Sequence, residues 1–419
     1  MTTTATTARE RMLLAKEASR AIGLLRDEQK RDALLGIANA IETAAREIVD
    51  ANGEDLERGR VTGLSEALQD RLRLDESRVA ALAAAVRDIA ALPDPVGRVL
   101  DERTLANGVS LTKVSVPFGV VGSIYEARPN VTVDIAALAL RSGNAVVLRG
   151  GSAAERTNAA LVKAMRGALV EQGIDPEAIQ TVDDFGRDGA RELMQARGVV
   201  DVLVPRGSAQ LIETVVTESS VPVIETGAGV VHIVLDESAP LDWARDIVVN
   251  AKIQRPSVCN AVETVLVIRD AAPRLVPPVV EALRAQGVTV HGDATVASLA
   301  DGITPATDED WATEYLSLDI AMRVVDDLDE ALDHIRRYST HHTESIITQD
   351  PAHAERFLAE VDSAVVMANA STRFTDGGEF GFGAEVGIST QKLHARGPMG
   401  LSELTSTKWL ARGVGQVRV

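Results

Sequence analysis

Cysteine, aromatic residues and positive charge are all scarce in this 419-residue chain, and each shortage limits the kinds of protein that the chain can be. With one cysteine, Cys259, the chain forms no internal disulfide, so nothing indicates an oxidising compartment. A formal net charge of −18 disfavours a nucleic-acid binder, which needs a basic face to neutralise phosphates. Aromatic residues make up 3% of the chain, so we predict aliphatic cores.

Long apolar runs are also missing from the sequence. No stretch has the length and hydrophobicity of a transmembrane helix, and the first residues, MTTTATTARERMLL, hold no apolar core of signal-peptide length. We therefore expect a cytoplasmic protein without membrane association. No His, Cys and acidic residues have metal-ligand spacing, and both Gly-x-Ser-x-Gly and the P-loop are missing, so we expect no metal.

Alternating strand-like and helical segments fill the chain from Val114 onwards. Runs rich in Val, Leu and Ile are separated by helical segments of ten or more residues. This alternation predicts βαβ units and parallel sheets buried on both faces. One such run, VPVIETGAG (residues 221–229), is predicted to be a strand, and a second α/β domain is expected to start near Gly227.

The N-terminal region has a helical pattern instead. Apolar residues recur at helical spacing over residues 8–50 and again over residues 75–92. The Asn52-Gly53 pair predicts a helix stop between these segments. We assign no chemistry to these helices.

The single cysteine lies in a short polar loop, QRPSVCN (residues 254–260), just before a strand-like run. A substrate can reach a thiol there, and Arg255 would favour the thiolate, which is the nucleophilic form. On this residue alone, the alternative that Cys259 is a small buried hydrophobic residue without chemistry stays open.

Two turns that join a strand to a helix through glycine are candidates for a phosphate-bearing cofactor. One is Arg149-Gly150-Gly151-Ser152 and the other contains Gly207-Ser208. Backbone N–H groups at a helix N-terminus favour a phosphate. Ser152 stands where a carboxylate would repel a ribose 2′-phosphate, which favours NADPH over NADH. Both turns are equally typical of ordinary βα connections, with Ser208 as a helix cap.

Three more polar residues follow strand-like runs. In VPFGVVGSIYEARPNVTVD (residues 116–134), Pro129 favours extended geometry at Arg128, and the Asn130 amide could donate to an oxyanion. Glu225, in VPVIETGAG, could act as a general base. An ordinary turn at Asn130 and a capping or paired role for Glu225 remain alternatives.

Taken together, VPFGVVGSIYEARPN, QRPSVCNAVET and HARGPMGLSELTSTKW resemble the aldehyde dehydrogenase superfamily, and within it the enzymes that reduce L-glutamate 5-phosphate in proline biosynthesis. The resemblance covers nearly the whole chain after the N-terminal helices. It implies two α/β domains with parallel-rich open sheets and a small β oligomerisation unit. The implied parts are a cofactor-binding domain (1–106 and 120–226), a catalytic domain (227–368), oligomerisation strands (107–119 and 388–419) and a connection (369–387).

The resemblance also implies roles for individual residues. Cys259 matches the nucleophile, and Asn130 with the Cys259 backbone N–H matches the oxyanion hole. Glu225 stands where aldehyde-oxidising members keep a general base, although Thr-Gly-Ala follows it in place of Leu-Gly-Gly. Arg128 and Arg255 are candidates for the substrate phosphate or carboxylate. The residues expected around NADPH or NADP are Arg149, Gly150, Gly151, Ser152, Gly207, Ser208 and Glu314, with Arg149 in place of the usual Lys and Glu314 on the nicotinamide ribose.

The implied activity is NADPH-dependent reduction of L-glutamate 5-phosphate to L-glutamate 5-semialdehyde and phosphate, through a thioester on Cys259. The alternative is oxidation of a small aldehyde to a free acid, with water activated by Glu225. The resemblance further implies a homodimer or homotetramer, and glutamate 5-kinase is a candidate partner that would hand over the labile acyl phosphate.

Overall fold

The computed structural model describes residues 7–126 and 128–418, in two compact units. The prediction about the N-terminus bears partly on residues 1–6, which lie outside the described residues. No helix within the described ranges is long and apolar enough to cross a membrane. The first unit comprises Met1–Glu225, Gly381–Gly387 and Met399–Val419, and the second comprises Thr226–Phe380 and Ile388–Pro398.

A four-stranded parallel sheet forms the centre of the first unit, in the order β5-β4-β3-β6. Its strands are short runs of mostly buried aliphatic residues, as the sequence predicted for a sheet covered on both faces. The strands are β3 (Val120–Tyr125), β4 (Ala145–Arg149), β5 (Ile179–Thr181) and β6 (Val202–Arg206). The helices that follow them are α6 (Pro129–Arg141), α7 (Glu155–Glu171), α8 (Gly186–Met194) and α9 (Ala209–Glu218).

From residue 7 onwards, five helices precede this sheet. The predicted helix stop at Asn52-Gly53 is wrong. The helices are α1 (Ala8–Ile22), α2 (Asp27–Thr43), α3 (Ala45–Val61), α4 (Glu66–Leu72) and α5 (Glu76–Ala91). Helix α3 continues through Asn52 because that side chain is buried and fully engaged. Its Nδ2 donates to the Leu72 carbonyl at 2.8 Å, and its Oδ1 accepts from the Leu74 N–H at 2.7 Å.

The second unit holds a seven-stranded sheet in the order β10-β9-β11-β8-β7-β12-β13, parallel throughout. The strands are β7 (Val231–Leu235), β8 (Val262–Ile268), β9 (Thr289–Gly292), β10 (Thr304–Pro305), β11 (Asp319–Val325), β12 (Thr343–Ile347) and β13 (Val365–Ala368). The helices are α10 (Leu241–Ile253), α11 (Ala272–Ala285), α12 (Ala294–Leu299), α13 (Leu328–Tyr338) and α14 (Pro351–Glu360). The strand predicted over residues 221–229 is wrong, because only Val223 forms an isolated bridge there.

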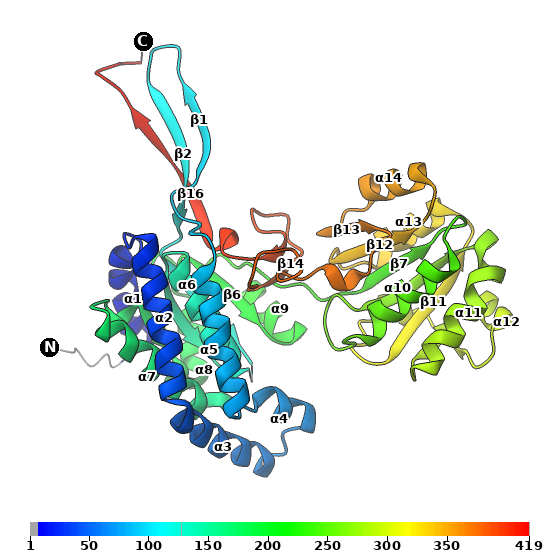
Figure 1. Cartoon of the computed structure of the whole chain (residues 1–419), viewed down its shortest axis with the longest axis horizontal. Helices are drawn as coiled ribbons and strands as arrows, with labels where there is room; N and C mark the ends of the chain where they lie inside the picture. The colour runs from blue at the N-terminus through cyan, green and yellow to red at the C-terminus, as the bar shows by residue number, and fades with distance from the viewer. Residues whose placement is uncertain (1–6, 127, 419) are drawn as a thin grey trace. The chain divides into compact units, whose positions relative to one another are not determined.

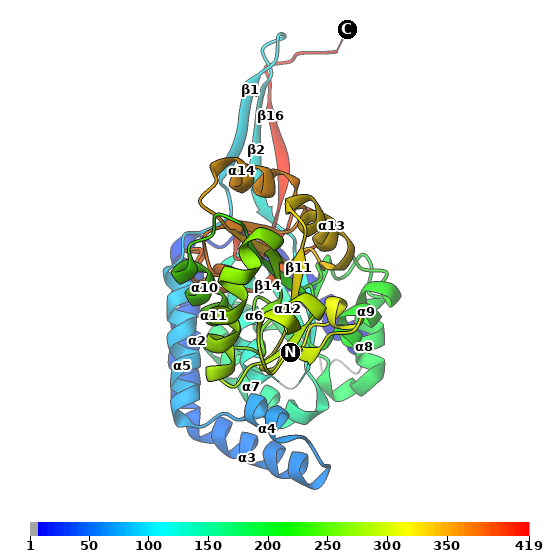
Figure 2. The same ribbon diagram turned by 90° about the vertical axis from the view of Figure 1, so that its right-hand side faces the viewer.

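An antiparallel arm extends from the first unit. It consists of β1 (Val99–Thr104), β2 (Ser110–Pro117) and β16 (Thr405–Arg412), in the order β1-β2-β16. Figures 1 and 2 show the arm standing away from the helices of this unit in both views. Two short strands, β14 (Gly387–Ser389) and β15 (Gly397–Met399), lie where the chain passes between the units.

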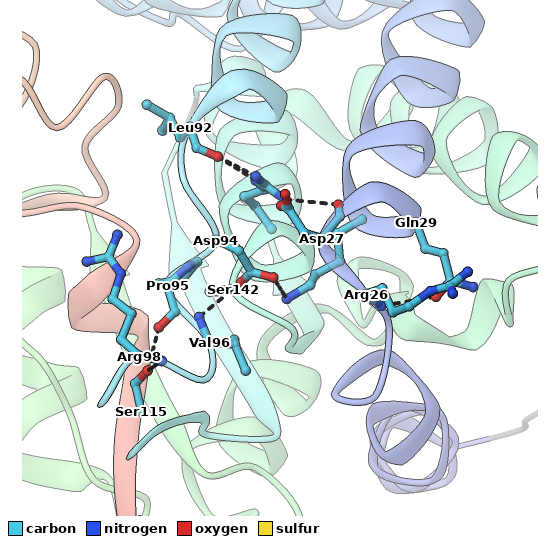
Figure 3. A network of polar contacts seen from close by, with 12 residues as sticks. Arg26, Asp27, Gln29, Leu92, Asp94, Pro95, Val96, Arg98, Ser115 and Ser142 are labelled. Atoms are coloured by element: carbon cyan, nitrogen blue, oxygen red, sulfur yellow. Dashed lines mark hydrogen bonds and ion pairs between the residues drawn. The ribbon is translucent and has the colours of Figure 1, made fainter. Parts of the chain in front are cut away.

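A polar network anchors the foot of this arm to the helices (Figure 3). The buried Lys30 ammonium of α2 pairs with Asp94 at 2.6 Å, just after α5. At the next residue in the chain, the Pro95 carbonyl accepts from the Ser115 hydroxyl of β2 at 2.6 Å. Arg141 at the end of α6 joins the same region, because its guanidinium pairs with Asp27 at 2.6 Å and donates to the Leu92 carbonyl.

We expect Lys30→Met to lower the free energy of unfolding by about 3 kcal/mol, since Asp94 then loses the partner of a buried ion pair. Denaturant titration measures this change. The matched control is Arg46→Met, whose pair with Asp50 spans 4.0 Å with the Arg side chain 96% exposed. That variant should stay within about 0.5 kcal/mol of wild type. Equal effects for the two variants would contradict the anchoring role.

Candidate active site

Cys259 lies in a turn between α10 and β8 in the second unit. The residue is partly exposed, so its interpretation as a buried hydrophobic residue is wrong. Its neighbour Asn260 is buried and anchors the turn, because its Nδ2 donates to the Thr375 carbonyl at 2.7 Å. The Thr372 hydroxyl donates back to the Asn260 carbonyl at 2.8 Å. These two bonds hold the loop that carries Cys259 against the segment around residues 371–376.

A buried ion pair brackets the same loop. The Lys252 ammonium, at the end of α10, lies 2.6 Å from Glu263 Oε2 at the start of β8, and both side chains are fully buried. Lys252 also donates to the Val262 carbonyl at 3.1 Å. Burial raises the pKa of Glu263 to about 7, and Lys252 opposes that shift. The pair joins the two ends of the segment that carries Cys259.

Glu314 is linked to Cys259 through a glycine. Its Oε1 accepts from the Gly229 N–H at 2.7 Å, and burial raises the pKa of this carboxyl. Gly229 packs directly on the loop that carries Cys259, since a Cβ there would lie 1.6 Å from the Cys259 carbonyl oxygen. Nearby, Glu263 Oε1 accepts from the N–H of Leu316, which has a φ of 55°. Two of the predicted site residues, Cys259 and Glu314, are thus brought together.

We expect Gly229→Ala to lower kcat by roughly 10²-fold, because the added methyl group must displace the Cys259 carbonyl and small displacements of a reacting group are costly. Steady-state kinetics measure this effect. Gly53→Ala is the matched control: Gly53 lies in α3, and a Cβ there would meet nothing within 4 Å. A Gly229→Ala enzyme with wild-type kcat would show that the close packing does not position the nucleophile.

In the first unit, Asn130 lies in the first turn of α6, immediately after Pro129. Arg128 precedes the helix with φ −145° and ψ 83°. This ψ lies below the range of about +120° to +160° expected before a proline, so the predicted extended geometry at Arg128 is wrong. The Asn130 Nδ2 donates to Asp134 Oδ2 at 3.2 Å. Burial raises the pKa of Asp134 to about 6. Sequence reasoning missed Asp134, although its i+4 spacing from Asn130 on a helix indicates the contact.

The turn after β4 contains features that fit a cofactor. The Arg149 Nε is buried and, among the described residues, has no hydrogen-bond partner. Gly150 is required there because a Cβ would lie 2.1 Å from Asn158 Nδ2, and its N–H donates to Asp183 at 2.6 Å. A buried donor without an acceptor fits an oxygen-rich group such as a ribose or phosphate.

Both helix N-termini predicted to bind phosphate are occupied by internal carboxylates. At α7, Asp55 accepts from the Thr157 N–H at 2.9 Å. At α9, Glu126 accepts from the Ser208 N–H at 2.8 Å and from its hydroxyl at 2.9 Å. Ser208 also caps α9, as the alternative interpretation held. A phosphate at either turn must therefore compete with a carboxylate of the chain itself.

Three comparisons relate this geometry to known proteins. A model of the aldehyde dehydrogenase family matches residues 1–302. The gamma-glutamyl phosphate reductase of Leifsonia xyli subsp. xyli is 64% identical over 417 residues, with 100% of this chain and 99% of that protein covered. The one from Clavibacter michiganensis subsp. michiganensis is 66% identical, with 98% and 95% covered. The chain belongs to the gamma-glutamyl phosphate reductase family.

The solved structures agree with this membership. The crystal structure of the gamma-glutamyl phosphate reductase from Thermotoga maritima matches with a TM-score of 0.97 at 44% identity, covering 98% of this chain and 100% of that one. The predicted aldehyde dehydrogenase-like α/β fold is therefore confirmed. Within the described ranges, no group of three or more His, Cys, Asp or Glu residues is placed to hold a metal ion.

Two further residues predicted to act in the site of this gamma-glutamyl phosphate reductase family member, Glu225 and Arg255, are at least partly exposed. Glu225 is the last residue of the first unit's main segment and is partly exposed. Arg255 is exposed and directly follows Gln254, the residue that caps the C-terminus of α10. The oxyanion hole made by the Asn130 amide and the Cys259 backbone N–H stays a prediction.

Proposed function

We propose that this chain reduces L-glutamate 5-phosphate to L-glutamate 5-semialdehyde and phosphate with NADPH, through a thioester on Cys259. Family membership supports the overall reaction. The observation that carries the mechanism is the partly exposed Cys259 in a loop fixed on both sides, by Asn260 and by the Lys252–Glu263 pair. Asn260 and this ion pair leave the only cysteine of the chain accessible in a rigid frame.

Cys259 acts as the nucleophile in this proposal. Its thiolate sulfur bonds to the acyl carbon, and the bond from that carbon to the phosphate oxygen breaks, with the electron pair leaving on phosphate. The Asn130 amide, oriented by Asp134, and the Cys259 backbone N–H donate to the oxyanion that forms on the way. Arg128 and Arg255 bind the leaving phosphate, for which the guanidinium group is well suited.

We assign binding of the cofactor, NADPH, to the residues that the family resemblance implies. When bound, NADPH supplies the hydride that reduces the thioester. Arg149, through its Nε, which is buried and has no hydrogen-bond partner in the described part of the chain, would hold the adenosine ribose with Gly150, Gly151 and Ser152. Gly207 and Ser208 would contact a phosphate once Glu126 has moved away, and Glu314 would hold the nicotinamide ribose.

The phosphate requirement of the reverse reaction tests this proposal. We expect oxidation of L-glutamate 5-semialdehyde to need phosphate or arsenate, and to proceed faster with NADP than with NAD. Oxidation that proceeds without phosphate would instead support the second candidate, a dehydrogenase that forms a free acid with Glu225 as base.

The assembly and location of the enzyme complete the proposal. The arm exposes Val99, Leu100 and Trp409 and has two edge strands, β1 and β16, which suits pairing with a second copy. We assign it to the interface of a homodimer or homotetramer, which sedimentation equilibrium tests. Glutamate 5-kinase as supplier of the acyl phosphate and a cytoplasmic location belong to the same proposal.

A further inference from the structure

A pocket of about 210 Å³ lies in the second unit beside the loop that carries Cys259. Its wall includes the 3-10 turn Thr372–Phe374, which is the segment that Asn260 holds. The pocket and Cys259 are thus built on one rigid frame. The residues that line it are Asn250, Gln254, Arg373, Phe374, Asp376 and Glu379.

Arg373 is the cation of this pocket, and its sequence context gave no sign of a role. The residue is partly buried, and its Nε donates to Gln254 Oε1 at 2.8 Å. Among the residues that the structure describes, Arg373 forms no ion pair. Burial lowers the pKa of Arg373, Asp376 opposes this shift, and the Arg255 guanidinium lowers the pKa further. The Cys259 thiolate and Glu379 also oppose the shift. An anionic ligand would compensate this partly desolvated cation.

The same pocket also contains two carboxylates. A turn fixes the Asp376 side chain, whose Oδ1 accepts from the Gly378 N–H at 2.8 Å. Glu379 is exposed and lines the pocket beside it. A doubly charged phosphate would be repelled by these two groups. A ligand with one negative and one positive group matches the pocket instead.

We propose that this pocket binds the α-amino-acid end of the glutamyl substrate, with Arg373 on the α-carboxylate and Asp376 and Glu379 on the α-ammonium. This inference rests on the proposed function. It places the two charged ends of the substrate apart: the zwitterionic end takes Arg373, and the phosphate end takes Arg255. The short methylene chain of a glutamyl group separates its α-carbon from the acyl carbon that Cys259 attacks.

Two substrate analogues, each lacking one charged group, test the assignment in the oxidative direction. Glutarate semialdehyde lacks the α-ammonium, and 4-aminobutanal lacks the α-carboxylate. We expect Arg373→Met to raise KM for glutamate semialdehyde roughly 10²-fold while kcat changes less than about tenfold. The same variant should leave kcat/KM for 4-aminobutanal within about threefold of wild type, since that substrate has no carboxylate for Arg373 to bind.

Variants of the two carboxylates in the pocket are expected to affect only substrates that carry an ammonium group. The double variant Asp376→Asn, Glu379→Gln should raise KM for glutamate semialdehyde by roughly 10²-fold and leave glutarate semialdehyde almost unaffected. Arg373→Lys should restore part of the lost affinity. Arg245→Met, which removes an exposed arginine of α10 paired with Asp246, is the matched control and should match wild type with every substrate.

The pattern separates failure of this inference from failure of the proposed function. Wild-type turnover of glutamate semialdehyde with phosphate reports on the function itself, and its absence would overturn both. If wild type turns over but each pocket variant lowers kcat/KM equally for all three substrates, or for none, the pocket does not recognise the amino-acid end.

Discussion

Replacing Cys259 by alanine is expected to reduce turnover of L-glutamate 5-phosphate by roughly 10⁵-fold, because no acyl-enzyme can form without the sulfur. The chain has no second cysteine to replace it. NADPH binding should be unchanged, because alanine removes only one atom from a turn held by Asn260. Loss of nicotinamide absorbance measures turnover, and a fluorescence titration with NADPH measures binding.

The control for this variant is Ser257→Ala, an exposed hydroxyl in the same loop, for which we expect wild-type rates. Thermal unfolding of both variants shows whether the loop substitutions disturb the fold. Turnover by Cys259→Ala within tenfold of wild type, at equal stability, would remove the covalent mechanism.

Replacing Asn130 by alanine is expected to lower kcat by about 10²- to 10³-fold, because a preorganised donor to the oxyanion is lost. KM should change little, since the amide interacts with charge that develops only in the transition state. Single-turnover kinetics at saturating substrate measure the effect on the chemical step.

Asp134→Asn distinguishes donation by Asn130 from a merely structural contact. The carboxylate that accepts from Asn130 is lost, but the donor amide stays, so we expect a loss of less than about tenfold. Because burial raises the pKa of Asp134 to about 6, its negative charge opposes folding at neutral pH and that cost vanishes below pH 3.8. A larger kinetic loss for Asp134→Asn than for Asn130→Ala would contradict the oxyanion role.

The sequence predicted the architecture well because each element has a local signal. The parallel sheets follow from buried aliphatic runs separated by helices. The start of α6 was not predicted, because Arg128 and Asn130 were interpreted as part of a turn, although Pro129 is typical of a first helical position. The failures come from tertiary contacts. Asn52 continues a helix that its propensity should end, since its amide bonds to Leu72 and Leu74.

In the candidate site, too, residues with a local sequence signal were predicted and residues that depend on tertiary contacts were missed. Cys259 stood out because the chain has only one cysteine, whereas Arg373 lies more than a hundred residues further along, and only folding brings its turn to Asn260. The phosphate turns illustrate a limit of helix-dipole arguments. A glycine turn indicates available amides, but the sequence does not show that Asp55 and Glu126 already accept from them.

The most direct test of the account is the mass of the peptide that contains Cys259 after acid quench. Wild-type enzyme is mixed with NADP and L-glutamate 5-semialdehyde in the absence of phosphate, so that the acyl group cannot leave to phosphate. We predict a glutamyl adduct on Cys259 that disappears when phosphate is added before the quench. An unmodified Cys259 peptide in an enzyme that forms NADPH once phosphate is present would contradict the thioester mechanism.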